Sequence, residues 1–501
     1  MNSIRKSKLN IIFSLIYQIV AIILGLLIPR ITIVLYGSNV NGLLSSATQF
    51  VRYLIVFEAG IQLLATKSLY KTVGCDDKAG TNEILSAVNK NYKKIGVYYF
   101  IGLVALSAIF PLVTKEENLK YFTVFFVVLF SGMSNVVLFF FQGKYRILLQ
   151  VEGKNYFINL INIITNIFSQ AVRIVLLYFK VNIAIVVLGT FIVSMLPATI
   201  IMIYIKKKYK WIDLNVKPNF SALKQTKETI VHQVAGLIFS NTDTLILTIF
   251  CGLKAVSVYV IYKMIYDYML SFAQIPLDGM SFRLGQLYSN DREKFKEYIS
   301  SVELFSSNLC FILFTVTLCL TSAFVGLYTK GVEDINYVDE KLALLFAAMQ
   351  LLNCMRKPKL YTINYAGHFK QTLIPTIIET GINIVVSIIG VLLWGIYGVL
   401  LGTIAALTYR TIDVIIYSNK KLLKRSPLRT FSYYLVEGLL LGGIYLLFNS
   451  FNIAIDSYFK FILVGLILIV IVGVIFVSIS CLLFQREFVF LKSKILKKNL
   501  N

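Results

Sequence analysis

The chain has 501 residues, of which 57% are hydrophobic and only 15% are charged, and its mean hydropathy is +0.75. This composition excludes a water-soluble globular protein and indicates an integral membrane protein. The net charge of +24 does not indicate nucleic-acid binding, because the basic residues lie between hydrophobic segments and not on a soluble basic face.

Apolar segments separated by charged and turn-rich breaks predict an all-α polytopic membrane protein with about fourteen transmembrane helices. In chain order the predicted spans are 9–36, 41–66, 95–114, 121–142, 156–179, 183–205, 229–250, 255–279, 302–328, 341–367, 373–394, 397–418, 431–449 and 459–484. The first exceeds the ~20 residues that cross a bilayer, and no small-residue cleavage site follows a short apolar core. We therefore expect it to remain in the mature protein.

The tenth span is the least regular, because only the apolar residues 342–355 precede the basic cluster at 356–359. This run is shorter than the ~20 residues that a spanning helix needs. Without this span, however, the basic segment 420–429 would lie outside the cell, against the positive-inside rule. We therefore keep it as a span with Arg356 and Lys357 in its inner half.

The distribution of lysine and arginine predicts the orientation. If the N-terminus is cytoplasmic, most of the 49 Lys and Arg residues fall on the inner side. Both termini are then cytoplasmic, and the outer loops, such as 36–42 and 394–398, are short. The longest of them, around 329–341, is acidic. No extracellular domain remains to carry out chemistry there.

The sequence lacks the usual signatures of an enzyme. Its six cysteines are scattered without a CxxC pair, and it has only two histidines, so we expect neither a disulfide framework nor a metal site. HExxH, GxSxG, Walker A and GxGxxG motifs in a suitable setting are also missing. We expect no enzymatic activity and no cofactor.

An internal repeat organises the chain. An offset of 213 residues aligns 188–209 with 401–422 at seven identical positions, and an offset of 215 pairs Gly37 with Gly252 and Tyr53 with Tyr268. Each repeat holds six predicted spans, an even number, so the two copies have the same orientation in the membrane. This predicts two pseudo-symmetric lobes around a central cleft, an architecture typical of alternating access.

The predicted domains follow from this repeat. They are an N-terminal lobe at 1–205, a cytoplasmic linker at 206–228, a C-terminal lobe at 229–418, and a final segment at 419–501 with two more spans and a basic cytoplasmic tail.

Five basic residues lie inside predicted spans: Arg30, Arg52, Arg173, Lys263 and Arg410. Facing lipid at the middle of a helix, each would cost about 2.5–3.5 kcal/mol. Lys263 with Asp267, and Arg410 with Asp413, have the spacing to neutralise one another on one helix face. Arg30 follows Pro29, where we expect a kink, and snorkelling to the surface is its alternative. Arg52 and Arg173 have no acidic residue within a turn.

The repeat relates Arg52 to Asp267, and we expect both to face the cleft between the lobes. With Arg30, Lys263, Arg356 and Lys357 this cleft would be basic on balance. Glu58, Asp243 and Asp267 form its acidic minority and are candidates for binding a coupled ion. A basic cavity selects anions, and guanidinium groups suit phosphate because they donate two parallel hydrogen bonds and stay charged.

Several segments resemble the polysaccharide-repeat-unit (Wzx-type) flippases of the multidrug/oligosaccharidyl-lipid/polysaccharide exporter superfamily. They are IPRITIVLYGSNVNGLLSS at 28–46, FEAGI at 57–61, NEILSAVNKNYKKIG at 82–96 and LLNCMRKPKLYTINYAGHFKQT at 351–372. The resemblance covers nearly the whole chain and implies a multi-pass protein of the bacterial cytoplasmic membrane. It also implies a cationic central cavity, a role that Arg30 and Arg52 would share because they lie in or beside these segments.

The implied function is to move an undecaprenyl-pyrophosphate-linked oligosaccharide to the outer leaflet, for capsule or another surface polysaccharide. Polysaccharide polymerases and glycosyltransferases would be its partners. A lipid II flippase of the same superfamily is the close alternative. A drug exporter fits less well, because it would typically have twelve spans and an acidic cleft. A membrane glycosyltransferase would need larger polar loops, and a structural scaffold would leave the buried arginines unexplained.

Overall fold

The computed structural model describes residues 3–58, 60–114, 119–223, 227–451 and 453–485. In these ranges the regular structure is helical throughout, so the predicted all-α fold is confirmed. Eleven helices in the described ranges are long and apolar enough to cross a membrane, and each corresponds to a predicted span.

The other three predicted spans, 41–66, 255–279 and 341–367, are also helical but more polar. The first is broken into α2 (Ser38–Tyr53), η1 (Leu54–Glu58) and α3 (Ile61–Gly74). Gly60 lies at the break with a φ of 79°, a conformation that glycine adopts without steric cost. The other two lie within α11 (Gly252–Asn290) and α13 (Glu340–Ala366). By contrast, α1 (Ser3–Tyr36) continues through Pro29 as one helix.

The chain divides into two compact units, Met1–Val258 and Tyr259–Asn501. We call them unit 1 and unit 2. This division reflects packing, whereas the predicted lobes rest on the internal repeat, whose boundaries stay a prediction.

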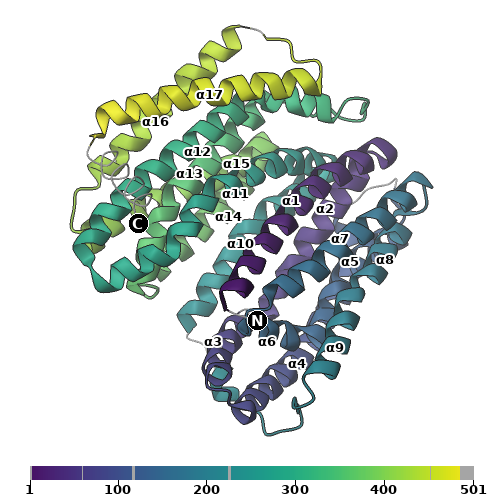
Figure 1. Cartoon of the computed structure of the whole chain (residues 1–501). Helices are drawn as coiled ribbons and strands as arrows, with labels where there is room; N and C mark the ends of the chain where they lie inside the picture. Colours follow the sequence, from purple (N-terminus) through teal and green to yellow (C-terminus); the bar gives the residue numbers. More distant parts are fainter. Residues whose placement is uncertain (1–2, 59, 115–118, 224–226, 452, 486–501) are drawn as a thin grey trace. The chain divides into compact units, whose positions relative to one another are not determined.

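Unit 1 is a bundle of helices (Figure 1). Besides α1, α2 and α3, it contains α4 (Lys78–Thr114), α5 (Tyr121–Val137), η2 (Leu138–Gln142), α6 (Gly143–Val151), α7 (Asn155–Tyr178), α8 (Ile183–Ser194), α9 (Leu196–Lys208), η3 (Phe220–Leu223) and α10 (Lys227–Phe250). Buried aromatic residues of α4 fill its core: Tyr92 and Tyr99 pack edge-on against Phe139, and Phe110 against Phe50.

Within unit 1, α2 packs closely on α10 and the start of α11 through small polar residues. The Oγ of Ser46 lies 2.7 Å from the Oγ1 of Thr248, and Asn41 donates a hydrogen bond of 2.8 Å to Ser257. A Cβ on Gly42 would lie 1.9 Å from the carbonyl oxygen of Leu253, so only glycine permits this approach. Small residues and interhelical hydrogen bonds are typical of helix packing in membranes, where lipid provides no hydrophobic driving force.

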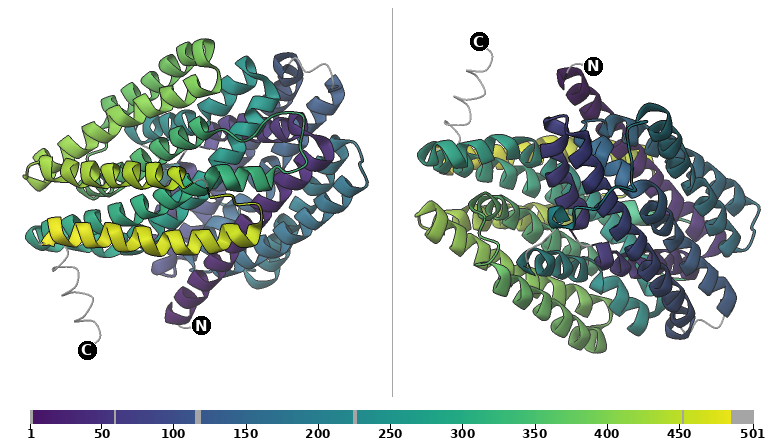
Figure 2. Two further views of the ribbon diagram at one scale, coloured as in Figure 1. Left: turned by 90° about the horizontal axis from the view of Figure 1, so that it is seen from above. Right: turned by 90° about the horizontal axis from the view of Figure 1, so that it is seen from below.

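Unit 2 contains most of α11 together with α12 (Arg292–Tyr328), α13, α14 (Leu373–Trp394), α15 (Ile396–Tyr417), η4 (Ser418–Leu423), α16 (Leu428–Ser450) and α17 (Tyr458–Leu483). Figure 2 shows α16 and α17, in yellow-green and yellow, and both helices contact α12. The helices α14 and α15 approach through glycines: a Cβ on Gly398 would lie 1.9 Å from the carbonyl oxygen of Gly390.

Candidate functional site

Three of the basic residues predicted inside spans lie in unit 1, namely Arg30, Arg52 and Arg173. Arg52, in the last turn of α2, is exposed and forms no ion pair with another described residue. Arg173 is half-buried on α7, and its Nε is enclosed without a hydrogen-bond partner among the described residues. Arg30 is half-buried on α1. Unit 1 therefore presents arginine charge that its own described carboxylates do not cancel.

A cavity of about 670 Å³ lies in unit 1 between η1, α3, α6 and α10. Three amide side chains line it, those of Gln62, Gln150 and Gln233, together with Glu58. The Oε1 of Gln233 is buried without a hydrogen-bond partner among the described residues. A cavity with several amides and one carboxylate is suited to hydroxyl-rich ligands, because amides both donate and accept hydrogen bonds.

Two of the three predicted acidic residues also lie in unit 1. Glu58 ends η1 and accepts a hydrogen bond of 2.8 Å from the hydroxyl of Tyr92. Asp243 is buried on α10, beside Thr242, whose hydroxyl lies 3.2 Å from that of Tyr53 on α2. Both carboxylates are thus held inside the unit.

In unit 2 the predicted residues other than Lys357 join one continuous polar network. Its first part links α11 to α13. Lys263 forms an ion pair of 3.0 Å with Asp267, which accepts a hydrogen bond of 2.6 Å from Gln350. Asn353 donates to Gln350 at 2.9 Å and accepts from Arg356 at 2.8 Å.

The second part of this network links α13 to α14 and α15. Arg356 forms an ion pair with the buried Glu379 of α14. Arg410 of α15 lies 3.5 Å from the same carboxylate and donates a hydrogen bond of 2.6 Å to Asp413. With Lys263 and Asp267 the network contains three cations and three carboxylates, so it is neutral when all are ionised. Both local pairs that the sequence allowed, Lys263–Asp267 and Arg410–Asp413, form.

Lys357 is the remaining predicted cation, and it points to α11 instead of joining this network. Its Nζ donates a hydrogen bond of 2.6 Å to Gln274 and lies 3.9 Å from Asp278. Lys357 thus also has a carboxylate within reach.

Sequence reasoning missed Glu379, which pairs with two arginines. A signal was present, because Glu379 is the single charged residue in the span 373–394. A lone acidic residue in an apolar helix is expensive in lipid and therefore indicates a partner on another helix.

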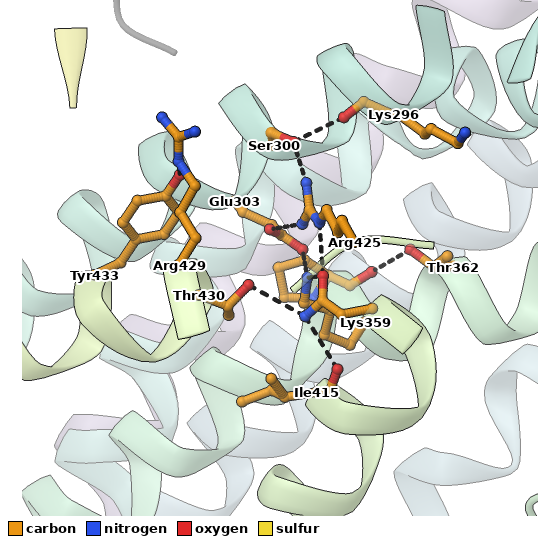
Figure 3. A network of polar contacts seen from close by, with 12 residues as sticks. Lys296, Ser300, Glu303, Lys359, Thr362, Ile415, Arg425, Arg429, Thr430 and Tyr433 are labelled. Atoms are coloured by element: carbon orange, nitrogen blue, oxygen red, sulfur yellow. Dashed lines mark hydrogen bonds and ion pairs between the residues drawn. The ribbon is translucent and has the colours of Figure 1, made fainter. Parts of the chain in front are cut away.

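Sequence reasoning also missed a buried triad in unit 2, shown in Figure 3. Glu303 of α12 forms ion pairs with Lys359 of α13 and with Arg425, which follows η4. The side chains of Glu303 and Lys359 are 1% and 0% exposed. Asn419 accepts hydrogen bonds from Lys359 at 3.2 Å and from Arg425 at 2.6 Å. No sequence spacing connects these residues, because they come from separate helices.

The helical arrangement is that of a polytopic all-α membrane protein. It is similar to a multidrug resistance MATE family transporter of the MOP superfamily in an inward-facing conformation, with a TM-score of 0.57 and 13% identity over 83% of this chain and 95% of that chain. An outward-facing MATE structure gives a TM-score of 0.53 at 13% identity over 86% of this chain and 97% of that chain.

The lipid II flippase MurJ, in its inward closed conformation, is similar over 94% of this chain and 99% of that chain, with a TM-score of 0.64 and 18% identity. No protein-family model matches the chain, and no curated protein is similar to it in sequence. At these identities the similarities establish the fold. The transported substrate has to be argued from the residues.

Proposed function

We propose that this protein is a flippase that moves undecaprenyl-pyrophosphate-linked oligosaccharide repeat units from the inner to the outer leaflet of the bacterial cytoplasmic membrane. The lipid-linked oligosaccharide would serve capsule or other surface polysaccharide assembly, with polymerases and glycosyltransferases as partners. Transport would proceed by alternating access, with both termini in the cytoplasm.

The observation that carries the proposal is the uncancelled arginine charge of unit 1. Arg52 and Arg173 have no ion-pair partner among the described residues, whereas every predicted cation of unit 2 has a carboxylate within 4 Å. A charge in an apolar setting is costly unless it is paired. An anionic substrate is therefore the partner that these arginines lack, and a pyrophosphate matches the fork of a guanidinium.

The cavity of unit 1 that three glutamines line supports an oligosaccharide as the other part of the substrate. Its amide groups, among them the unpartnered Oε1 of Gln233, offer donors and acceptors to sugar hydroxyls. The inside-negative membrane potential favours outward movement of an anion by about 2.3 kcal/mol per charge per 100 mV. A coupled ion would add to this force, and Glu58 and Asp243 are its candidates, because Asp267 is already paired with Lys263.

The test is transport in liposomes. Purified protein is reconstituted, and outer-leaflet exposure of a labelled polyprenyl-pyrophosphate oligosaccharide is followed over time. We expect Arg52→Ala to slow transport at least about tenfold, because a charge-assisted hydrogen bond contributes about 1.5–3 kcal/mol. We expect Arg52→Lys to retain part of the rate, since a point charge remains but the bidentate geometry is lost.

Lys71→Ala is the matched control, because it removes an exposed cation of unit 1 in the last turn of α3. Unchanged transport by Arg52→Ala would exclude that residue from the site. Lipid II is tested in the same assay, because the similarity to the flippase MurJ favours it as the second candidate. Transport of lipid II alone would replace the proposed substrate, and transport of neither lipid would favour a drug exporter.

A further inference from the structure

A second cavity, of about 500 Å³, lies in unit 2 where α12 begins and where η4 joins α16. We call it the basic pocket. Its charged lining residues are Glu293, Lys296, Glu297, Lys424, Arg425 and Arg429. Four cations therefore face two carboxylates, and the excess positive charge lies at the surface end of two apolar helices.

Arg425, which lines this pocket, belongs to the triad with Glu303 and Lys359 (Figure 3). Arg425 is held by Glu303 at 2.6 Å, by Asn419 at 2.6 Å and by the hydroxyl of Ser300. Because Lys359 also contacts Glu303, the triad has two cations for one carboxylate. The positive charge of Arg425 is therefore fixed in place before any ligand binds.

Two lysines at the rim are able to reach a ligand. Lys424 is exposed, forms no ion pair with another described residue, and has a φ of 51°, a left-handed conformation that a lysine rarely adopts. Lys296 forms an exposed ion pair of 2.6 Å with Glu293, whose own side chain is 82% exposed. Such a surface pair contributes little, so an anion can compete for Lys296.

Exposed leucines follow the pocket residues along α16. Leu428, Leu435 and Leu439 are 73%, 65% and 69% exposed, and their spacing places them on one face of α16. Leu428 precedes Arg429 of the pocket. A positive pocket at the membrane boundary and an exposed leucine face beside it match the two parts of a phospholipid.

We infer that the basic pocket binds the phosphate headgroup of an anionic membrane phospholipid, whose acyl chains lie along the leucine face of α16. The positive-inside rule places this site at the cytoplasmic leaflet. The site is separate from the arginines proposed for transport, and its occupancy does not depend on what the protein transports.

Native mass spectrometry of the full-length protein in detergent tests this inference, with phosphatidylglycerol and phosphatidylcholine as competing probes. We expect preferential retention of phosphatidylglycerol. The double variant Lys296→Gln with Lys424→Gln should lose apparent affinity by about fivefold for each cation removed. Lys294→Gln is the matched control, because Lys294 lies on the same helix with its side chain 72% exposed and pairs with Asp291 outside the pocket.

Three results would overturn the inference: equal retention of the two lipids, a loss in the double variant no larger than in the control, or displacement of phosphatidylglycerol by an equal concentration of inorganic phosphate. The last result would assign the pocket to a soluble phosphate compound. Polyprenyl pyrophosphate, added as a third probe, would assign it to the transported lipid if it alone bound. The variant Lys296→Arg with Lys424→Arg should restore retention, which distinguishes lost charge from lost folding.

Discussion

The two units differ in how the basic residues of their helices are paired. In unit 2 each predicted cation has a carboxylate nearby, and Arg356, Glu379 and Arg410 share a network that crosses three helices. In unit 1, Arg52 and Arg173 have no such partner among the described residues. There α2 packs on α10 through hydroxyls and on the start of α11 through Gly42. Paired charges specify how helices pack, and we propose that the unpaired ones bind the transported anion.

The largest effect that tests this comparison is expected at Glu303. Glu303→Gln leaves the buried Lys359 and the half-buried Arg425 with no carboxylate between them. We expect the free energy of unfolding to fall by about 3–5 kcal/mol, measured by thermal or denaturant unfolding in detergent. Glu437→Gln is the control: Glu437 is equally buried but contacts Ser307 and forms no ion pair with a described residue, so we expect a change within about 1 kcal/mol. Equal effects would mean that pairing in unit 2 contributes nothing specific.

Arg410→Ala and Arg52→Ala compare the two units directly. Arg410→Ala should lower the free energy of unfolding by about 2 kcal/mol, because Asp413 loses its partner and Glu379 keeps only Arg356. Arg52→Ala should change it by less than about 0.5 kcal/mol, since no described contact is lost. Both are measured by unfolding in one detergent. A loss of stability in Arg52→Ala would contradict the difference between the units, because Arg52 would then be a structural residue.

Gly42→Ala tests whether unit 1 depends on close packing. The added Cβ would meet the backbone of Leu253, so we expect a loss of about 1–3 kcal/mol in the free energy of unfolding. Gly236→Ala on α10 is the control, because a Cβ there meets no atom within 4 Å. Alanine also has the higher helix propensity, so this variant should be neutral or more stable by up to about 1 kcal/mol. The prediction is wrong if the two variants unfold alike.

The smallest effect is expected for Ser46→Ala, which removes the hydrogen bond to Thr248. Interhelical hydrogen bonds in membrane proteins average about 0.6 kcal/mol, and we expect a loss of that size in the same unfolding measurement. Thr48→Ala is a control, because Thr48 bonds only to the carbonyl oxygen of Leu44 on its own helix. A loss above that of Gly42→Ala would mean that hydroxyl contacts, not close packing, hold α2 in place.

The sequence predicted the helices well, because the period and length of apolar segments are local properties. The three more polar predicted spans, such as 341–367 with its basic cluster, are also helical, and whether they cross the membrane stays a prediction. The local pairs Lys263–Asp267 and Arg410–Asp413 were also foreseeable, since residues three or four apart share a helix face.

The candidate site was harder to predict from the sequence than the helices were. The pairing of Arg356 with Glu379, and that of Glu303 with Lys359, depends on which helices become neighbours, and hydropathy does not encode this. The repeat related Arg52 to Asp267. It did not show that Asp267 pairs with Lys263 and accepts a hydrogen bond from Gln350. The break after η1 was missed because the apolar content of 41–66 continues through it.

The glycine contact between α14 and α15 has a mechanical consequence. Gly390 and Gly398 bring the two backbones so close that no Cβ fits between them, and we expect such close packing to keep the two helices together. Glu379 of α14 and Arg410 of α15 therefore belong to one closely packed helix pair. When unit 2 changes conformation, we expect α14 and α15 to move as one rigid body. The backbone would then rearrange in the loops at the ends of this helix pair.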